Sequence, residues 1–152
     1  MLNKITIFGV GLIGGSFALA LKKAHAVQQV VGVGRSVAVM ERARELGLID
    51  VIAASVAEAV DGADLILIAA PVAQTGAILA AIEPHLQSGT VVTDAGSTKT
   101  DVVLAARKAL GAKIGQFVPG HPIAGRELNG PAAAIDHLYV GKKTVLAPLP
   151  EN

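Results

Sequence analysis

Three loops of this chain carry residue types that can do chemistry. Residues 9–14 read GVGLIG, residues 94–99 read DAGSTK and residues 120–127 read GHPIAGRE. Closely spaced glycines let a backbone approach a phosphate group, whereas serine and histidine side chains take part in hydrogen bonding and proton transfer. The three stretches therefore predict one anion-binding loop and two loops suited to lining a reaction pocket.

The glycines of the first loop have the spacing G-x-G-x-x-G, directly after an apolar run and directly before a helical pattern. In that context Gly9 permits a tight turn, Gly11 lets the backbone approach a pyrophosphate, and Gly14 lets the helix pack closely on the strand. The first amides of the helix, around Leu12 and Ile13, would then face the phosphates. We interpret the motif as a dinucleotide-binding site, in preference to a glycine turn with a structural role alone.

Residues 34–36 (GRS) lie about twenty residues further on, where an NAD-binding protein usually carries an acidic side chain. The guanidinium of Arg35 and the hydroxyl of Ser36 suit a 2′-phosphate, which a carboxylate would repel. The pattern predicts NADP as the cofactor. NAD is the alternative, if Arg35 is only a solvated residue at the start of a helix.

Apolar runs and helical patterns alternate along the chain and position these loops. A loop rich in glycine and proline is expected from Pro119 to Pro131. Strands are expected at residues 4–8, 29–33, 51–54, 65–69, 90–93, 117–118 and 142–146, and helices at residues 16–23, 37–46, 56–60, 72–83 and 98–110.

Strands that alternate with helices form parallel βαβ units with right-handed crossovers. The expected fold is therefore α/β, a doubly wound, mostly parallel sheet with helices on both faces, as in the Rossmann dinucleotide-binding fold. Ligands of such sheets bind beyond the carboxyl ends of the strands. The loops at residues 9–15, 34–36, 70–75, 94–99 and 119–127 should accordingly converge.

The composition points to a small-molecule partner. The 152 residues carry a net charge of +1, with 16% charged and 52% hydrophobic residues, three Phe, one Tyr and no Trp. This composition argues against a disordered tail, a basic arm for nucleic acid, or the stacking platforms of single-strand binders. Cysteine is absent, which removes disulfides and thiolate sites and fits a cytoplasmic location.

Two uncharged stretches resemble targeting or membrane segments. Ile5–Leu21 contains four glycines, and Leu65–Ile82 is interrupted near its middle by Pro71, Gln74 and Gly76. Both interruptions fit a strand, a turn and a helix better than a signal peptide or a membrane span. We therefore expect no membrane partner.

The three loops together resemble the prephenate/arogenate dehydrogenase family, also called cyclohexadienyl dehydrogenases. Its members combine a fingerprint ending Gly-Leu-Ile-Gly-Gly-Ser with Asp-x-Gly-Ser-x-Lys and Gly-His-Pro-x-Ala-Gly-x-Glu. All three motifs occur here in that order, and the resemblance covers essentially the whole chain. It implies oxidative decarboxylation of prephenate to 4-hydroxyphenylpyruvate, or of arogenate to tyrosine, with hydride passing from the ring carbon that bears the hydroxyl to a nicotinamide.

The resemblance also implies roles for two side chains. His121 takes the part of the catalytic histidine, which accepts a hydrogen bond from the substrate hydroxyl as the carbonyl forms, and Ser97 hydrogen-bonds substrate or nicotinamide. A neutral imidazole is a competent acceptor, and Pro122 biases the backbone at His121 toward an extended form. Both residues are therefore expected in the catalytic pocket.

Simpler interpretations exist for several residues of these loops. In one, Ser97 caps the helix that follows. In another, Asp94 and Lys99 only orient their loop, and Glu127 pairs with the neighbouring arginine. No metal site is expected, because no ligand-spaced neighbours accompany the other histidines, His25, His85 and His137.

The chain departs from the family pattern in three respects. Arg126 stands where many members have threonine, and the acidic residue of NAD-preferring members is missing. Family members also continue into a helical dimerisation domain that supplies groups for the substrate carboxylates. We accordingly expect residues 1–147 to be the dinucleotide-binding domain and residues 148–152 to begin a linker. The full-length enzyme would be a homodimer, and the isolated chain would have little activity.

Two other functions are compatible with part of the pattern. A non-catalytic dinucleotide-sensing module accounts for the fingerprint and the short length but leaves His121 and Ser97 without a role. Another nicotinamide enzyme, such as a β-hydroxyacid dehydrogenase or an imine reductase, accounts for the cofactor loops but not for GHPIAG. The sequence does not distinguish prephenate from arogenate.

Overall fold

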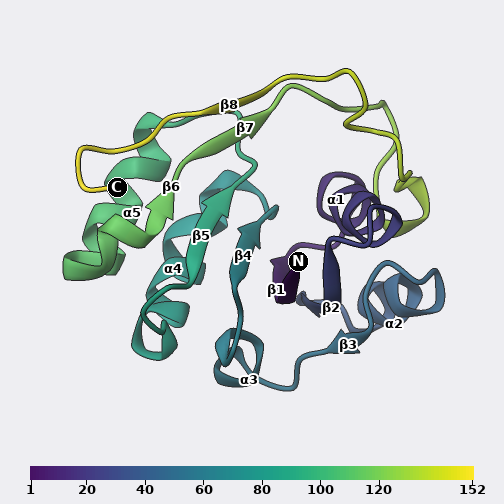
Figure 1. Ribbon diagram of the computed structural model, residues 1–152, viewed down its shortest axis with the longest axis horizontal. Coiled ribbons are helices and arrows are strands. Elements are labelled where there is room, and N and C mark those ends of the chain that lie inside the picture. Colours follow the sequence, from purple (N-terminus) through teal and green to yellow (C-terminus); the bar gives the residue numbers. More distant parts are fainter.

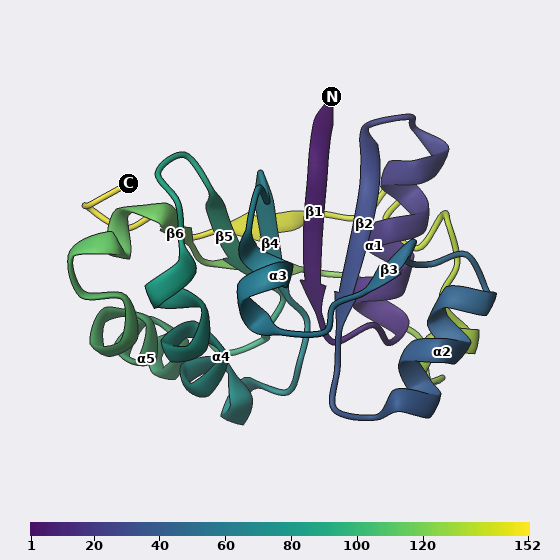
Figure 2. The same cartoon turned by 90° about the horizontal axis from the view of Figure 1, so that it is seen from below.

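A six-stranded parallel sheet forms the centre of the molecule, which is described over residues 1–152 by a computed structural model. Its strand order is β3-β2-β1-β4-β5-β6, and the six strands lie side by side in Figure 2. The prediction of a doubly wound α/β fold is therefore confirmed. The strands are β1 (Leu2–Phe8), β2 (Val27–Val33), β3 (Val51–Ile52), β4 (Leu65–Ile68), β5 (Val91–Asp94) and β6 (Phe117–Val118).

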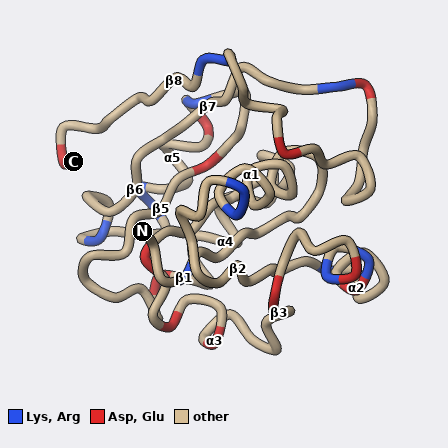
Figure 3. The backbone as a smooth tube through the Cα atoms, turned by 45° about the vertical axis from the view of Figure 1, so that its right-hand side comes forward, with Lys and Arg blue, Asp and Glu red and all other residues tan.

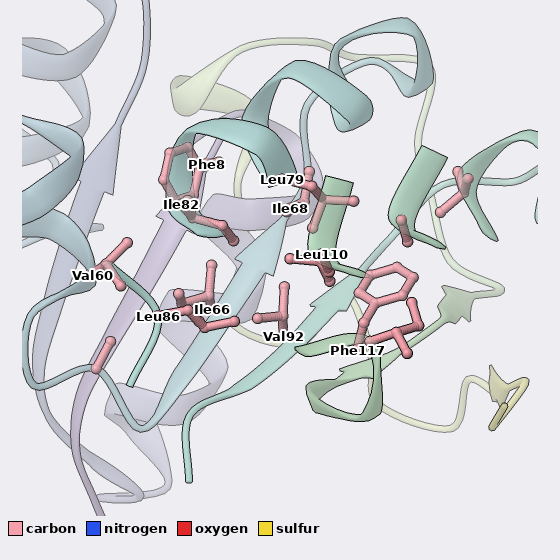
Figure 4. Packing of buried hydrophobic residues seen from close by; sticks show 14 residues of the cluster. Phe8, Val60, Ile66, Ile68, Leu79, Ile82, Leu86, Val92, Leu110 and Phe117 are labelled. Atoms are coloured by element: carbon pink, nitrogen blue, oxygen red, sulfur yellow. The ribbon is translucent and has the colours of Figure 1, made fainter. Parts of the chain in front are cut away.

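Five α-helices cover the two faces of this sheet (Figure 1). They are α1 (Leu12–Lys23), α2 (Val37–Glu45), α3 (Val56–Val60), α4 (Thr75–Ile82) and α5 (Thr100–Leu110). One apolar core lies between the sheet and α3, α4 and α5, and includes Phe8, Ile66 and Phe117 (Figure 4). A second core, which includes Ile7 and Met40, lies beneath α1 and α2. Burial on both faces explains why the central strands are continuous apolar runs.

A two-stranded antiparallel ribbon runs along one side of the molecule (Figure 1). It consists of β7 (Gly120–Pro122) and β8 (Thr144–Leu146), with His121 opposite Val145. The interpretation of residues 119–131 as a loop without a strand was wrong at β7, because a Gly-His-Pro stretch has no strand signature. The strand expected at 142–146 is present in shorter form, in this ribbon rather than in the main sheet.

Several helix boundaries also differ from the sequence prediction. α1 begins at Leu12, four residues before Ser16, because Gly14 and Gly15 are helical despite their low intrinsic propensity. α5 begins at Thr100 rather than at residue 98. The helix expected after Pro71 is divided into η1 (Val72–Gln74), α4 and η2 (Glu83–His85). The positions of α3 and β6 were predicted correctly.

The last residues pack against the domain. Asn152 donates from its amide nitrogen to the carbonyls of Gly115 and Phe117, at 3.0 Å each. Glu151 forms an ion pair with Arg107 of α5. The proposed linker role of residues 148–152 stays a prediction. No helix in the structure is both long enough and apolar enough to span a bilayer.

Candidate functional site

A cavity of about 820 Å³ opens at the carboxyl ends of β1, β2 and β4. We call it the larger cavity; residues 9–11, 34–36 and 69–71 are among those that line it. It lies where the strand order reverses, since β1 pairs with β2 on one side and β4 on the other. Doubly wound sheets bind their ligands at this point, and the volume is within the usual range of about 300–1,000 Å³ for small-molecule sites.

The three fingerprint glycines are required for different reasons. Gly9 has φ +93°, and a Cβ there would lie 2.7 Å from the carbonyl oxygen of Ala69. A Cβ on Gly14 would lie 2.8 Å from Cγ2 of Ile7, so α1 approaches the sheet too closely for any side chain. Gly11 borders open space, with no atom within 4 Å of a built Cβ. The fold therefore requires Gly9 and Gly14, whereas Gly11 leaves room for a ligand.

The N-terminus of α1 adjoins the larger cavity, whose lining includes its N-cap residue Gly11. Gly11 is the N-cap residue, and no side chain caps the helix. The first amide with a partner inside the turn is that of Gly15, which donates to the carbonyl of Gly11 at 2.8 Å. The amides before it, including those of Leu12 and Ile13, have no acceptor within the helix. Such a terminus is an anion site when it faces a cavity.

Arg35 and Ser36 line the same cavity at the end of β2. The exposed Arg35 takes part in no ion pair, whereas Arg42 and Arg44 of α2 pair with Glu45 and Glu41 (Figure 3). The hydroxyl oxygen of Ser36 accepts from the amide of residue 39 at 3.3 Å and so caps α2. Its O–H is still able to donate, and the pair can meet an anionic group at this end of the cavity.

The second and third motif loops meet at the side chain of Asp94, the last residue of β5. One carboxylate oxygen accepts from the amide of Gly96 at 2.9 Å, and the other accepts from the amide of Gly120 at 3.1 Å. Lys99 forms an ion pair with Asp94 and donates to the carbonyl of Gly120 at 2.6 Å. The interpretation in which Asp94 and Lys99 orient their loop therefore agrees with these contacts, which also join this loop to the one that carries His121.

Ser97 and His121 lie beside this junction, outside the larger cavity. Ser97 is exposed and does not cap α5, whose N-cap residue is Lys99, so the capping interpretation was wrong. His121 is half-buried in β7. Its neighbours Gly120 and Pro122 line a smaller cavity of about 320 Å³, and because side chains alternate along a strand, the imidazole lies on the opposite face of the ribbon.

The five loops that were expected to converge lie in a row, and each contacts the next. The loops after β1, β2 and β4 line the larger cavity. A Cβ on Gly96 would lie 3.0 Å from Cγ2 of Val72, so the loop after β5 touches the one after β4. Asp94 then connects the loop after β5 to Gly120, which follows β6. Ser97 and His121 thus lie at the same edge of the sheet as the larger cavity.

A segment that sequence reasoning missed closes one side of the larger cavity. Gly130 and Pro131 are part of its lining. The segment is held to α1 by the amide of Ile135, which donates to the buried hydroxyl of Ser16 at 3.0 Å, and by the Tyr139 hydroxyl, which donates to the carbonyl of Ile13 at 2.7 Å. Burial raises the pKa of the Tyr139 phenol. The sequence signal for this attachment was the Gly-Gly-Ser extension of the fingerprint, because its serine, Ser16, holds the segment.

The remaining polar residues of the third loop form few contacts. Arg126 donates to the carbonyl of Ala133 at 3.4 Å and makes no ion pair with Glu127, so that expected pairing was wrong. No group of three or more metal-ligating side chains lies together in the structure.

Comparison with known proteins identifies a matching family and several similar enzymes. The family described as "Prephenate dehydrogenase, nucleotide-binding domain" matches residues 17–152. A prephenate dehydrogenase of Bacillus subtilis is 40% identical over 152 residues, covering 97% of this chain and 40% of that protein. A cyclohexadienyl dehydrogenase of Zymomonas mobilis is 38% identical, covering 95% of this chain and 48% of that protein. The chain thus spans less than half the length of these curated relatives.

Solved structures agree with this grouping. Prephenate dehydrogenase from A. aeolicus, in complex with hydroxyphenyl propionate and NAD+, superimposes with a TM-score of 0.90 at 34% identity. The match covers 99% of this chain and 52% of that one. Synechocystis arogenate dehydrogenase superimposes with a TM-score of 0.86 at 30% identity, covering 97% and 51% of the two chains.

Proposed function

Because this chain belongs to the prephenate dehydrogenase family, as its nucleotide-binding domain, we propose that it binds NADP in the larger cavity and supplies part of a dehydrogenase active site. The observation that carries the proposal is the uncapped N-terminus of α1 facing that cavity, with open space at Gly11. Free amides at a helix start and a glycine without a steric neighbour suit a pyrophosphate.

The choice of NADP over NAD rests on Arg35. Its guanidinium is exposed at the end of β2, has no ion-pair partner and lines the larger cavity beside Ser36. A guanidinium forms paired, charge-assisted hydrogen bonds with a phosphate. The structure of the A. aeolicus relative contains NAD+, so the proposed preference of this chain for a 2′-phosphate needs a direct test.

The proposed reaction is the oxidative decarboxylation of prephenate or arogenate in tyrosine biosynthesis. The bound nicotinamide supplies the hydride acceptor. His121 accepts a hydrogen bond from the substrate hydroxyl as the carbonyl forms, and loss of carbon dioxide then makes the ring aromatic and restores the hydroxyl, which keeps its proton. Ser97 hydrogen-bonds substrate or nicotinamide. The position of both residues, at the edge of the sheet where the larger cavity opens, supports these roles.

We also propose that the complete enzyme carries a further, dimerising domain that completes the substrate site and that it works in the cytoplasm as a homodimer. The share of the relatives that this chain spans supports the further domain, since the matched region covers only 40% and 48% of those two enzymes.

The cofactor proposal is tested by titrating the chain with NADP and with NAD in a calorimeter. We expect NADP to bind more tightly. Arg35→Ala should weaken NADP binding by about 1.5–3 kcal/mol, roughly 10–150-fold in Kd, and leave NAD binding nearly unchanged. Arg42→Ala, on α2 but outside the cavity lining, is the matched control. Equal Kd values for the two cofactors would count against the role of Arg35, and no binding of either would refute the proposed site.

A further inference from the structure

We propose that Asp94 is the residue that positions both Ser97 and His121, with the partly buried Lys99 as its counter-ion. The inference rests on the proposed function for its catalytic meaning, because it concerns the two side chains assigned to the reaction. The claim that Asp94 fixes the two loops depends only on the contacts of its carboxylate.

Each carboxylate oxygen of Asp94 accepts a backbone hydrogen bond from a different motif loop. Oδ2 accepts from the amide of Gly96 at 2.9 Å, one residue before Ser97. Oδ1 accepts from the amide of Gly120 at 3.1 Å, one residue before His121. One side chain thus fixes the backbone next to each of the two residues.

Lys99 completes the connection from the other side. It pairs with Asp94 and donates to the carbonyl of Gly120 at 2.6 Å, so both peptide groups that flank Gly120 are held. Only 1% of the Asp94 side chain is exposed, against 24% for Lys99. A carboxylate so deeply buried is tolerated because it is paired and hydrogen-bonded.

The strand that carries His121 needs such an anchor. β7 and β8 are three residues each, and a two-stranded ribbon of that length is not stable by itself in water. The side chains of Val145 and Leu146 in β8 are more than half exposed, so this strand is poorly buried. A Cβ on Gly120 would lie 2.9 Å from the carbonyl oxygen of Asp94, which shows how closely β7 is drawn against β5.

Asp94→Asn is the most informative substitution, because it preserves shape and removes one acceptor. An amide side chain has only one oxygen, so the amide of Gly96 or that of Gly120 loses its partner, and Lys99 loses its charge partner. Lys99→Met removes the second half of the contact. Lys113→Met is the matched control, since Lys113 also contacts one carboxylate and one backbone carbonyl, those of Glu83, far from both loops.

The first readout is amide hydrogen exchange in the 152-residue chain. We expect exchange at Gly96 or Gly120 to be at least about tenfold faster in Asp94→Asn, and at Gly120 in Lys99→Met, with the core strands still protected. If either single variant unfolds, the same exchange measurement is made on the double variant Asp94→Asn/Lys99→Met, which leaves no unpaired buried charge. Unchanged exchange at both glycines in folded variants would overturn the inference.

The second readout is single-turnover hydride transfer in the complete enzyme. The Asp94→Asn rate should fall by roughly tenfold to a hundredfold, with cofactor Kd within about twofold of wild type and Lys99→Arg recovering part of the loss that Lys99→Met causes. A normal rate in Asp94→Asn, or an equal loss in Lys113→Met, would overturn the positioning role. An inactive wild type would instead refute the proposed function, and the exchange data would still decide whether Asp94 fixes the two loops.

Discussion

Two glycines of the fingerprint have different roles: the packing of the fold requires Gly14, whereas Gly11 leaves space for a ligand. Gly14 is enclosed by Ile7, Ala69 and the carbonyl oxygen of Gly9, whereas Gly11 has no neighbour within 4 Å of a built Cβ. An alanine at Gly14 has to displace packed atoms, which typically costs about 1–3 kcal/mol. An alanine at Gly11 meets only the space where we place the pyrophosphate.

We therefore predict different outcomes for two alanine substitutions. Gly11→Ala, at an N-cap position where alanine is less favoured than glycine, should lower the free energy of unfolding by no more than about 1 kcal/mol, yet weaken dinucleotide binding by about tenfold or more. Gly14→Ala should lower the free energy of unfolding. Urea denaturation and calorimetry of both variants check this, and a Gly11→Ala variant that binds NADP as wild type does would remove the pyrophosphate from this loop.

For His121 we predict an effect on the rate of the reaction. In the complete enzyme, His121→Asn should lower the rate of hydride transfer by roughly a hundredfold to ten-thousandfold, because the imidazole accepts its hydrogen bond as the transition state forms. Cofactor affinity should stay nearly unchanged. Single-turnover rates and cofactor titrations of both proteins test this prediction, and a variant rate within a fewfold of wild type would make His121 a structural residue.

At the scale of elements, the segment from Gly130 to Tyr139 connects the third motif to the fingerprint helix. Tyr139 donates to the carbonyl of Ile13 and packs edge-on against Phe17, with ring centroids 6.2 Å apart. Since Gly130 lines the larger cavity, the attachment of this segment to α1 also fixes part of the cavity wall. The phenol therefore contributes to the shape of the larger cavity without lining it.

The raised pKa of Tyr139 makes this attachment sensitive to alkali. The unfolded chain releases the phenol proton near its ordinary pKa of about 10, whereas the folded chain retains it. The stabilisation is thus complete below about pH 10 and is lost as the pH rises toward the folded pKa. Tyr139→Phe should cost about 1 kcal/mol at pH 8, and its difference from wild type should shrink as the pH rises above 10. Parallel unfolding curves from pH 8 to pH 11 would contradict this.

The sequence predicted elements wherever local pattern and tertiary packing agree. The helix at residues 56–60, the apolar strands and the first loop follow from hydrophobic runs and glycine spacing alone. β7 could not be predicted, because Gly120 and Pro122 disfavour a strand, and contacts from β8, Asp94 and Lys99 hold it extended. The start of α1 was missed for a related reason: Gly14 is a poor helix former that close packing requires.

At the scale of the whole molecule, the site is divided along one edge of the sheet. The larger cavity and Arg35 lie at one part of this edge, and Ser97 and His121 lie further along it, next to the loop contacts of Asp94. The sequence predicted which loops share this edge, since all follow the carboxyl ends of parallel strands. It did not predict the contact of Asp94 with Gly120, which lies 26 residues further along the chain.

This division predicts the behaviour of residues 1–152 by themselves. The chain should bind cofactor but turn over neither prephenate nor arogenate at a useful rate, because a substrate with carboxylates lacks part of its binding site and misplaced reacting groups lose most of the proximity advantage. Purified chain, titrated with cofactor and assayed with both substrates, provides the measurement. Turnover at the rate of a complete family enzyme would show that this chain holds the entire active site.

The most direct test of the account is a crystal structure of residues 1–152 with NADP bound. We predict that the pyrophosphate lies against the first amides of α1 next to Gly11 and that the 2′-phosphate contacts Arg35. The nicotinamide should extend toward the loops of Ser97 and His121. A dinucleotide bound elsewhere, or bound with its pyrophosphate away from the start of α1, would contradict the account.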